Sequence, residues 1–237
     1  MLLYFIRHGD PIYTPDSLTE QGTKQADALA KRLVKSKINK IYSSTSNRSV
    51  LTAKPTCNLL NIELTLLDWC NEKYSYEEFT GYNSENKRYF LMDCDNYRKL
   101  FVSKRIRDLQ FNWYEDESFA DMKCKSGMER ILTKTEDFLE ELGYKHNREN
   151  CTYTAVNPND DRVALFAHAG FGSVFLSCLL DIPYPIFATR FGMGHSNITV
   201  VEFRERNIVV PRVLTFSNDS HLYKEELPTK WCNKIEI

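Results

Sequence analysis

Two histidines in this chain stand directly after short apolar runs. The run Leu2–Ile6 is followed by Arg7 and His8, and the run Arg162–Ala167 is followed by His168. A neutral imidazole can attack phosphorus, and an ordinary histidine pKa of about 6.5 leaves much of the ring neutral at pH 7. Nearby cations lower that pKa and favour the nucleophilic form. These residue types therefore suit transfer of a phosphoryl group through a covalent histidine intermediate.

Positive charge is expected near both histidines. Arg7 adjoins His8, and Arg48 follows the predicted strand Ile38–Ser43 near the start of the next helix. A helix beginning near Gly170 directs its positive N-terminus at the same place. Arginine holds phosphate oxygens with its planar fork and stays charged. Taken singly, each arginine could be a surface ion-pair residue and each histidine an unrelated strand end; together they predict a site for a phosphoryl dianion.

Hydrophobic periodicity predicts strands that alternate with helices along the chain. Such alternation favours a mostly parallel sheet covered on both faces. We therefore predict an α/β fold in three layers, with a mostly parallel central sheet flanked by helices. Ligands of such sheets bind beyond the carboxyl ends of the strands. The predicted strands are Leu2–Ile6, Ile38–Ser43, Ile62–Leu67 and Arg162–Ala167, the predicted helices are Gln21–Leu33, Asn47–Leu60, Met128–Leu142 and Gly170–Leu180, and a hairpin is predicted around Arg204–Asn207.

The stretch from about residue 71 to residue 125 differs from the rest of the chain. It is rich in aromatic and charged residues and has little periodicity. We interpret residues 1–237 as a single domain, with a helical insertion at about 71–125 over the active-site edge. The aromatic residues of the insertion could roof a substrate pocket, but we favour a small core of its own. These residues are Tyr74, Tyr76, Phe79, Tyr82, Tyr89, Phe90 and Trp113.

Composition excludes several classes of partner. Lysine and arginine number 31, aspartate and glutamate 32, and the formal net charge is −1. Such a balance gives no general attraction to nucleic acid or to acidic membranes, and no apolar stretch approaches the roughly 20 residues of a membrane span. Seven cysteines without a C-x-x-C pair favour reduced thiols and a cytoplasmic location over disulfides or a zinc site.

Four stretches, taken in order, resemble the motifs of one known family. They are "RHG" at residues 7–9, "LTEQGTKQA" at 18–26, "YSSTSNRSVLTA" at 42–53 and "VALFAHAG" at 163–170. This order is similar to that of the histidine phosphatase superfamily, which has the phosphoglycerate-mutase-like fold. The resemblance covers most of the chain and is weak in the insertion. It implies a metal-independent phosphatase without a cofactor, which hydrolyses a small phosphomonoester through a phosphohistidine.

The resemblance also assigns roles to residues of this chain. It implies that His8 is the nucleophile and that Arg7, Arg48 and His168 form the phosphate pocket. These groups would stabilise charge on the phosphoryl oxygens, so that catalysis rests mainly on placement and electrostatics. No cysteine or histidine spacing indicates a metal site.

The leaving oxygen needs a proton, usually from a carboxylic acid. Members of this family usually place a glutamate after the strand that follows the helix bearing the second arginine. We choose Glu72 as the general acid, with Asp68, Glu77 and Glu78 left as alternatives. The usual E-x-x-x-G context is absent around Glu72.

One departure from the family bears on the type of reaction. Mutases of this family resemble RHG-x-S-x-x-N, whereas here Pro11 stands in place of the serine and Thr14 in place of the asparagine. We interpret Thr14 as a residue of a local turn. The change favours a phosphatase over a phosphomutase, and a catalytically weak module that binds phosphorylated ligands is a third reading. His195 could line the pocket mouth, but a loop histidine with local hydrogen bonds is the favoured interpretation.

Overall fold

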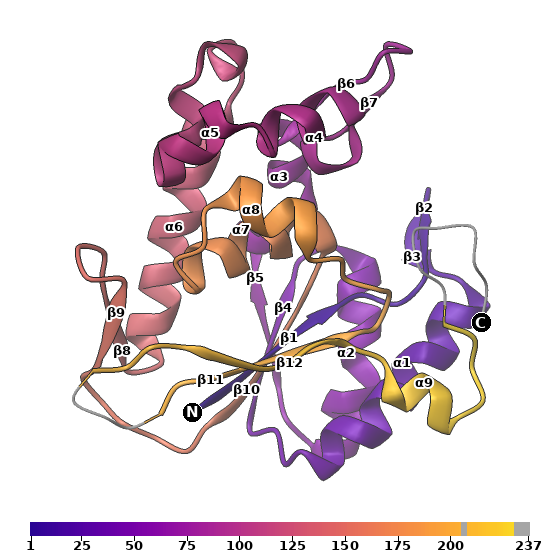
Figure 1. The fold of residues 1–237 in the computed structure, drawn as a ribbon. Coiled ribbons are helices and arrows are strands. Elements are labelled where there is room, and N and C mark those ends of the chain that lie inside the picture. The colour runs from indigo at the N-terminus through magenta and orange to yellow at the C-terminus, as the bar shows by residue number, and fades with distance from the viewer. Residues whose placement is uncertain (205–207, 230–237) are drawn as a thin grey trace.

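The computed structural model describes residues 1–204 and 208–229. Its centre is a six-stranded sheet with the strand order β12-β11-β1-β10-β4-β5 (Figure 1). Strands β1, β10, β4 and β5 run parallel, and β11 and β12 add an antiparallel edge beside β1. The strands of this sheet are β1 Leu2–Arg7, β4 Lys40–Ser44, β5 Leu64–Leu67, β10 Arg162–Ala167, β11 Ile198–Glu202 and β12 Arg212–Asn218.

Helices cover both faces of the sheet, so the predicted three-layer α/β fold is confirmed (Figure 1). The helices are α1 Glu20–Lys35, α2 Asn47–Leu60, α3 Glu72–Glu78, α4 Asp95–Phe101, α5 Lys104–Leu109, α6 Cys124–Glu141, α7 Ala169–Leu179, α8 Tyr184–Arg190 and α9 Ser220–Lys224. Thr19 caps α1 by accepting a hydrogen bond from the backbone N–H of Gly22, 2.9 Å away, as its residue type favours. Helix α2 continues through Pro55 and does not end early there.

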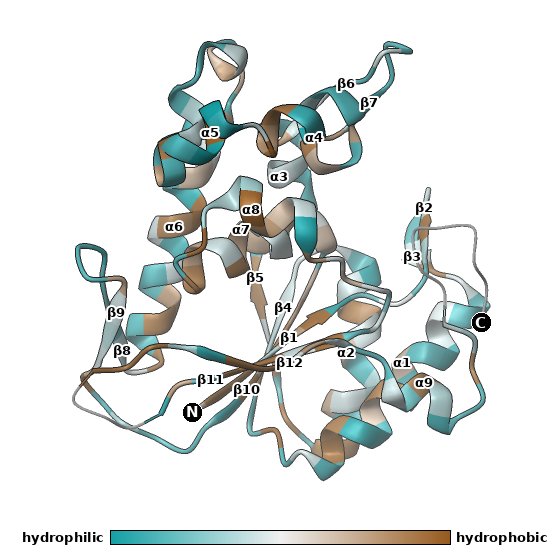
Figure 2. Cartoon of the chain, viewed as in Figure 1, coloured by the Kyte–Doolittle hydropathy of each residue, from teal (hydrophilic) through white to brown (hydrophobic). Residues whose placement is uncertain are grey.

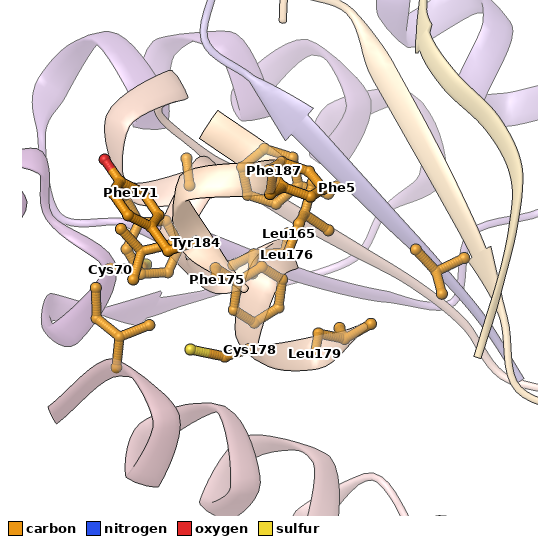
Figure 3. Packing of buried hydrophobic residues seen from close by; sticks show 14 of the residues in the cluster. Phe5, Cys70, Leu165, Phe171, Phe175, Leu176, Cys178, Leu179, Tyr184 and Phe187 are labelled. Carbon is orange, nitrogen blue, oxygen red and sulfur yellow. The ribbon is translucent and has the colours of Figure 1, made fainter. Parts of the chain in front are cut away.

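Successive residues of the central strand β1 pack in two separate apolar clusters, one on each face of the sheet. Tyr4 and Ile6 of β1 pack in the cluster that includes the apolar faces of α1 and α2. Leu3 and Phe5 of the same strand pack on the opposite face, where the ring of Phe5 stacks with that of Phe175 of α7 at a centroid distance of 5.8 Å. Figure 3 shows both residues among the buried apolar side chains of this cluster. This alternation follows from the two-residue period of a strand. In Figure 2 the hydrophobic residues gather on the central strands, while the tip between β6 and β7 is hydrophilic.

The stretch 71–125 lies above the carboxyl ends of the parallel strands (Figure 1). It holds helices α3, α4 and α5, several short 3₁₀ turns, and the small antiparallel pair of β6 (Thr80–Tyr82) and β7 (Arg88–Phe90). Its buried aromatic residues belong to the same apolar cluster as Phe5. Trp113 packs at ring-centroid distances of 4.9 Å from Phe119, 5.4 Å from Phe101 and 5.3 Å from Tyr184 of α8.

Outside the stretch 71–125, two hairpins and two short helices were not predicted from the sequence. One hairpin, of β2 (Pro11–Tyr13) and β3 (Asp16–Leu18), follows β1. Thr14 lies in the turn of this hairpin, which agrees with the interpretation of Thr14 as a turn residue. The hairpin of β8 (Tyr144–Asn147) and β9 (Thr152–Ala155) occupies a stretch of mostly polar residues for which no strand was predicted. The two helices are α8 and α9.

The predicted C-terminal hairpin is present as β11 and β12, although residues 205–207 of its connection lie outside the described part of the chain. Cys232 also lies outside that part, and the six described cysteines are free thiols. Among the residues described, no helix combines the length and apolar character needed to cross a bilayer.

Candidate active site

A cleft of about 1170 Å³ opens at the carboxyl edge of the parallel strands. Arg7 and His8 line it from the end of β1, and Arg48 lines it from the first turn of α2, which follows β4. His168 follows β10 directly and provides the N-cap position of α7. The backbone N–H of His8 donates to the carbonyl oxygen of Ala167, 2.9 Å away, and so ties the two histidine-bearing strand ends together.

The two imidazoles meet as predicted. The ring centroids of His8 and His168 are 5.2 Å apart, and both side chains are buried. Nδ1 of His8 lies 2.7 Å from the carbonyl oxygen of Gly9. Because a carbonyl oxygen only accepts, Nδ1 carries the proton and Nε2 keeps its lone pair. Burial, then the electrostatic effects of the neighbouring His168 and Arg7, hold the pKa of His8 well below its ordinary value.

His168 is fixed by contacts at both ring nitrogens. Nε2 lies 2.8 Å from Oγ of Ser44 and 3.2 Å from Oγ of Ser46, and Nδ1 lies 3.2 Å from Nη2 of Arg48. A guanidinium only donates, so Nδ1 accepts and the proton sits on Nε2, which faces the serine hydroxyls. Burial and then Arg48 and Arg7 hold the pKa of His168 well below 6.5, which agrees with a neutral ring.

Arg48 is oriented by Asp16, a residue that sequence reasoning missed. Nη1 of Arg48 donates to Oδ1 of Asp16 at 2.8 Å, and Oδ2 of Asp16 accepts the backbone N–H of Asn47 at 2.7 Å. One carboxylate thus holds the guanidinium and the start of α2 together. The hairpin of β2 and β3 places Asp16 there, and no local pattern predicted that hairpin. Tyr13, in the same hairpin, has its ring centroid 5.4 Å from Cζ of Arg48.

Arg7 reaches a different part of the cleft. Its Nη1 donates to the carbonyl oxygen of Met193 at 2.6 Å. Met193 belongs to the segment between α8 and β11, which also lines the cleft. The two arginines therefore approach the histidine pair from separate anchors, one on the hairpin after β1 and the other on the segment after α8.

Glu72 lies at the first position of α3 and points at His168. Its Oε2 is 3.4 Å from Nδ1 of His168, and its Oε1 accepts the backbone N–H of Phe171 at 3.3 Å. The side chain is 15% exposed, so it is largely removed from water but still lines the cleft. A Cβ on Gly170 would lie 2.3 Å from Oε1 of Glu72, so only glycine leaves room for this carboxylate against α7.

The other three candidate carboxylates have different surroundings. Asp68 accepts hydrogen bonds from Thr45 and Tyr74, which hold its pKa below the ordinary range and keep it ionised. Glu78 receives Nε and Nη2 of Arg130 at 2.7 and 2.6 Å. Glu77 lines the cleft but is exposed. Of the four, Glu72 is the one in contact with the histidine pair.

His195 packs directly on His8, contrary to the interpretation of a loop histidine with only local contacts. The two ring centroids are 5.6 Å apart, and Nδ1 of His195 lies 3.4 Å from Oδ1 of Asp10. Burial, followed by the charge of Arg7, lowers the pKa of His195 to about 4. The neighbouring Ser196 donates its backbone N–H to the carbonyl oxygen of His8 at 3.0 Å. This segment therefore packs against both the ring and the backbone of His8.

The aromatic residues of the insertion divide into two groups. Phe79 and Trp113 are fully buried and form part of the core, as we favoured. Tyr76, Tyr89 and Phe90 line the cleft. Phe90 also packs against the core cluster, so of these three the interpretation of an internal core is wrong for Tyr76 and Tyr89 only. Sequence periodicity could not separate the two groups, because they share one short and irregular stretch. Among the residues described, no three histidine, cysteine, aspartate or glutamate side chains are grouped as metal ligands.

A buried pair of neutral histidines, two arginines and a nearby glutamate at the carboxyl edge of an α/β sheet define a phosphate-handling enzyme of the histidine type. The model of the histidine phosphatase superfamily (branch 1) matches residues 3–215. The chain therefore belongs to this superfamily and is a phosphatase, a phosphoric monoester hydrolase.

Known proteins of similar sequence and fold are phosphatases. "Putative phosphoserine phosphatase 2" of Hydrogenobacter thermophilus is 24% identical over 153 residues, which make up 61% of this chain and 68% of that protein. A mutant phosphoserine phosphatase from Entamoeba histolytica in complex with phosphoserine has a TM-score of 0.59 at 18% identity, over 93% of this chain and 98% of its own. A mycobacterial glucosyl-3-phosphoglycerate phosphatase in complex with VO3 has a TM-score of 0.58 at 19% identity, over 91% and 98%.

Proposed function

We propose that this protein hydrolyses a phosphomonoester in two steps, through a phosphoryl group carried on Nε2 of His8. The observation that carries the proposal is the contact of Nδ1 with the carbonyl oxygen of Gly9, which leaves the lone pair on Nε2. The lowered pKa of His8 keeps that lone pair free at neutral pH. Division of the reaction into two displacements replaces one difficult step with two easier ones.

In the first step, Nε2 of His8 forms a bond to phosphorus while the bond from phosphorus to the leaving oxygen breaks. That oxygen takes a proton from the carboxylic acid of Glu72. In the second step, water attacks the phosphohistidine, the carboxylate of Glu72 takes the proton of this water, and Nε2 leaves with its electron pair. Inorganic phosphate is the product, and His8 and Glu72 return to their starting states.

Arg7 and Arg48 supply the positive charge for the phosphoryl oxygens, as the proposed phosphate pocket requires. His168 completes this pocket: its Nδ1 holds Nη2 of Arg48, and its ring packs beside that of His8. A metal ion has no assigned part in either step. The contact of Glu72 with His168 favours an enzyme over a catalytically weak module that only binds phosphorylated ligands.

We further propose that residues 1–237 form a single domain with an insertion at about 71–125, which selects the substrate. A small phosphorylated substrate is supported by the phosphoserine and the VO3 named for the two structural neighbours. A cytoplasmic location is an expectation from the cysteine pattern of the sequence. The absence of a nucleic-acid partner is likewise an expectation, from the near-neutral charge.

The experiment compares wild type with His8→Ala in the presence of a chelator, with p-nitrophenyl phosphate and a panel of sugar and nucleotide phosphates. We expect turnover by wild type only, with release of inorganic phosphate, and a mass increase of one phosphoryl group on wild type after a rapid quench at alkaline pH. Turnover by His8→Ala would contradict the proposed nucleophile. Loss of wild-type activity with chelator would contradict the metal-independent mechanism, and an isomeric phosphate ester as product would identify a mutase.

A further inference from the structure

The mouth of the cleft carries an unusual number of exposed aromatic side chains. Tyr13, Tyr76, Tyr89 and Phe191 are 68%, 40%, 44% and 38% exposed, and all four line the cleft. They come from the hairpin of β2 and β3, from α3, from β7 and from the segment after α8. Exposed aromatic residues scattered singly are ordinary, but a group that lines one concave site indicates a binding surface.

One wall of aromatic residues starts beside the proposed general acid. A Cβ on Gly170 would lie 2.3 Å from Cζ of Phe90 and 2.3 Å from Oε1 of Glu72, so the ring of Phe90 and this carboxylate approach the same point of α7. Tyr76 meets Phe90 edge to face, with ring centroids 5.7 Å apart. This wall therefore runs outward from the position at which the leaving oxygen would receive its proton.

Arg88 extends and fixes the same wall. Its Cζ lies 5.0 Å from the ring centroid of Tyr76, its Nε donates to Oγ1 of Thr80 at 2.6 Å, and its Nη2 donates to the carbonyl oxygen of Tyr76 at 3.4 Å. These contacts hold the guanidinium over the ring of Tyr76. Planar guanidinium and aromatic groups both stack on planar rings, so the wall presents two surfaces suited to the same kind of ligand.

A second aromatic residue adjoins the phosphate pocket itself. The ring of Tyr13 lies against Arg48, one of the two arginines assigned to the phosphoryl oxygens. The group bonded to a phosphate in the pocket would therefore extend into a cleft that Tyr13, Tyr76 and Phe90 line, with Tyr13 near the phosphate. A small amino acid or sugar acid would leave most of these rings uncovered in a cleft of about 1170 Å³.

We propose that the preferred substrate is a phosphomonoester whose leaving group carries a planar aromatic ring, seated in the cleft against Tyr13, Tyr76 and Phe90. This inference rests on the proposed function, because it describes the leaving group of the same reaction. An aryl group and a nucleobase share the required chemistry, which is a flat ring with an extended π face. Edge-to-face or offset contacts with such a ring contribute beyond simple burial of area.

The test compares two phosphates that differ in ring shape alone. Benzyl phosphate and cyclohexylmethyl phosphate both release a primary alcohol of similar size, but only the first has a flat ring. We expect wild type to show a kcat/KM about 3- to 10-fold higher for benzyl phosphate, which is the range of one or two aromatic contacts. In Tyr13→Leu and Tyr76→Leu this preference should fall toward one, mainly through KM.

The matched control is Tyr82→Leu. Tyr82 is 56% exposed and lies in β6, next to β7, but it does not line the cleft. This variant should keep the wild-type preference. Equal kcat/KM values for the two phosphates in wild type would overturn the inference while leaving the proposed function intact, because both compounds would still be hydrolysed. No hydrolysis of either compound or of p-nitrophenyl phosphate would instead overturn the proposed function.

A second comparison separates the two sources of the ring. Phosphotyrosine offers an aryl group bonded directly to the phosphate oxygen, whereas adenosine 5′-monophosphate offers a nucleobase farther away. A kcat/KM above that of phosphoserine for one of them supports the inference and identifies the source. If phosphoserine is hydrolysed with a higher kcat/KM than both, the proposed aromatic preference is wrong.

Discussion

Oε2 of Glu72 lies 3.4 Å from Nδ1 of His168. The other ring nitrogen of His168, Nε2, contacts the hydroxyls of Ser44 and Ser46. Because the pKa of His168 is well below 6.5, this imidazole is neutral at pH 7, and the two residues do not form an ion pair there. Oε2 of Glu72 has no hydrogen-bond partner within the described structure. Of the two carboxylate oxygens of Glu72, it is therefore the one with unused hydrogen-bonding capacity.

Glu72→Gln removes the proposed acid without a large change in shape. We expect kcat for substrates with poor leaving groups, such as alkyl phosphates, to fall by about 100-fold or more, the usual contribution of general acid catalysis. Hydrolysis of p-nitrophenyl phosphate should fall much less, because its leaving group needs no proton. The measurement is kcat for both substrates. Glu77→Gln, which changes an exposed carboxylate in the same cleft, should leave both rates close to wild type. Equal effects of Glu72→Gln on the two substrates would move the acid elsewhere.

Asp16→Ala removes the carboxylate that orients Arg48 and accepts the N–H of Asn47. A charged hydrogen bond is involved, so we expect the inhibition constant of inorganic phosphate to rise about tenfold, with a parallel rise in KM. Inhibition assays and binding calorimetry measure this change. Asp27→Ala, at an exposed position of α1, is the control and should not alter phosphate binding. Unchanged phosphate affinity in Asp16→Ala would show that Arg48 does not depend on Asp16.

Gly170→Ala should impair catalysis through Glu72. The added methyl group would lie 2.3 Å from Oε1 of Glu72 and from Cζ of Phe90, so the carboxylate must move. We expect a loss of at least about tenfold in kcat for poor leaving groups and little change in phosphate affinity. Gly192→Ala is the matched control, because a Cβ at Gly192 meets no atom within 4 Å although this glycine also lines the cleft. Wild-type kinetics in Gly170→Ala, with the fold intact by circular dichroism, would contradict the predicted displacement.

The pH dependence of activity should reflect the lowered pKa of His8. A nucleophile must be neutral, and burial with nearby positive charge keeps His8 neutral below pH 6.5. On the acid side of the kcat/KM profile, activity should therefore decrease with an enzyme pKa that is lower than 6.5. The profile is measured with two substrates whose phosphates have different pKa values. A pKa in the profile that comes from the substrate will differ between the two, whereas one that comes from the enzyme will not. An enzyme pKa at or above 6.5 would be inconsistent with the environment of His8.

Stability should also fall on the acid side, because of His195 and His221. Burial, with a smaller effect of Arg7, lowers the pKa of His195 to about 4. Burial, with a smaller effect of Arg32, lowers the pKa of His221 to about 3. Between these values and about 6.5, the unfolded chain binds more protons than the folded chain, so the free energy of unfolding decreases as the pH falls through this range. Urea denaturation at several pH values measures the slope. His221→Gln should reduce that slope, and an unchanged slope would contradict the assignment to His221.

The fold was largely predictable because its central strands are short, apolar and bounded by clear signals. The predicted strand Arg162–Ala167 is β10 itself, and the predicted helix Gln21–Leu33 lies within α1. The hairpin of β8 and β9 was missed because most of its side chains are polar. Its buried residues, Tyr144 and Tyr153, are too few to create a visible period.

The site was predictable where a residue lies at the end of a strand. His8, His168, Arg7 and Arg48 meet because the carboxyl ends of neighbouring parallel strands share one edge. Asp16 and His195 could not be inferred in this way. They reach the site through a hairpin and a loop whose paths depend on tertiary packing, so no spacing in the sequence reports their position.

Helix α8 connects the insertion at 71–125, which would select the leaving group, with the proposed phosphate pocket around Arg7. At its start, Tyr184 packs against Trp113 of the insertion, and beyond its end the carbonyl oxygen of Met193 accepts a hydrogen bond from Nη1 of Arg7. A change in the aromatic core of the insertion would therefore be transmitted to the arginine beside His8. Exchange of residues 71–125 for the corresponding region of another phosphatase should preserve turnover only when α8 and the segment through Met193 are exchanged with it.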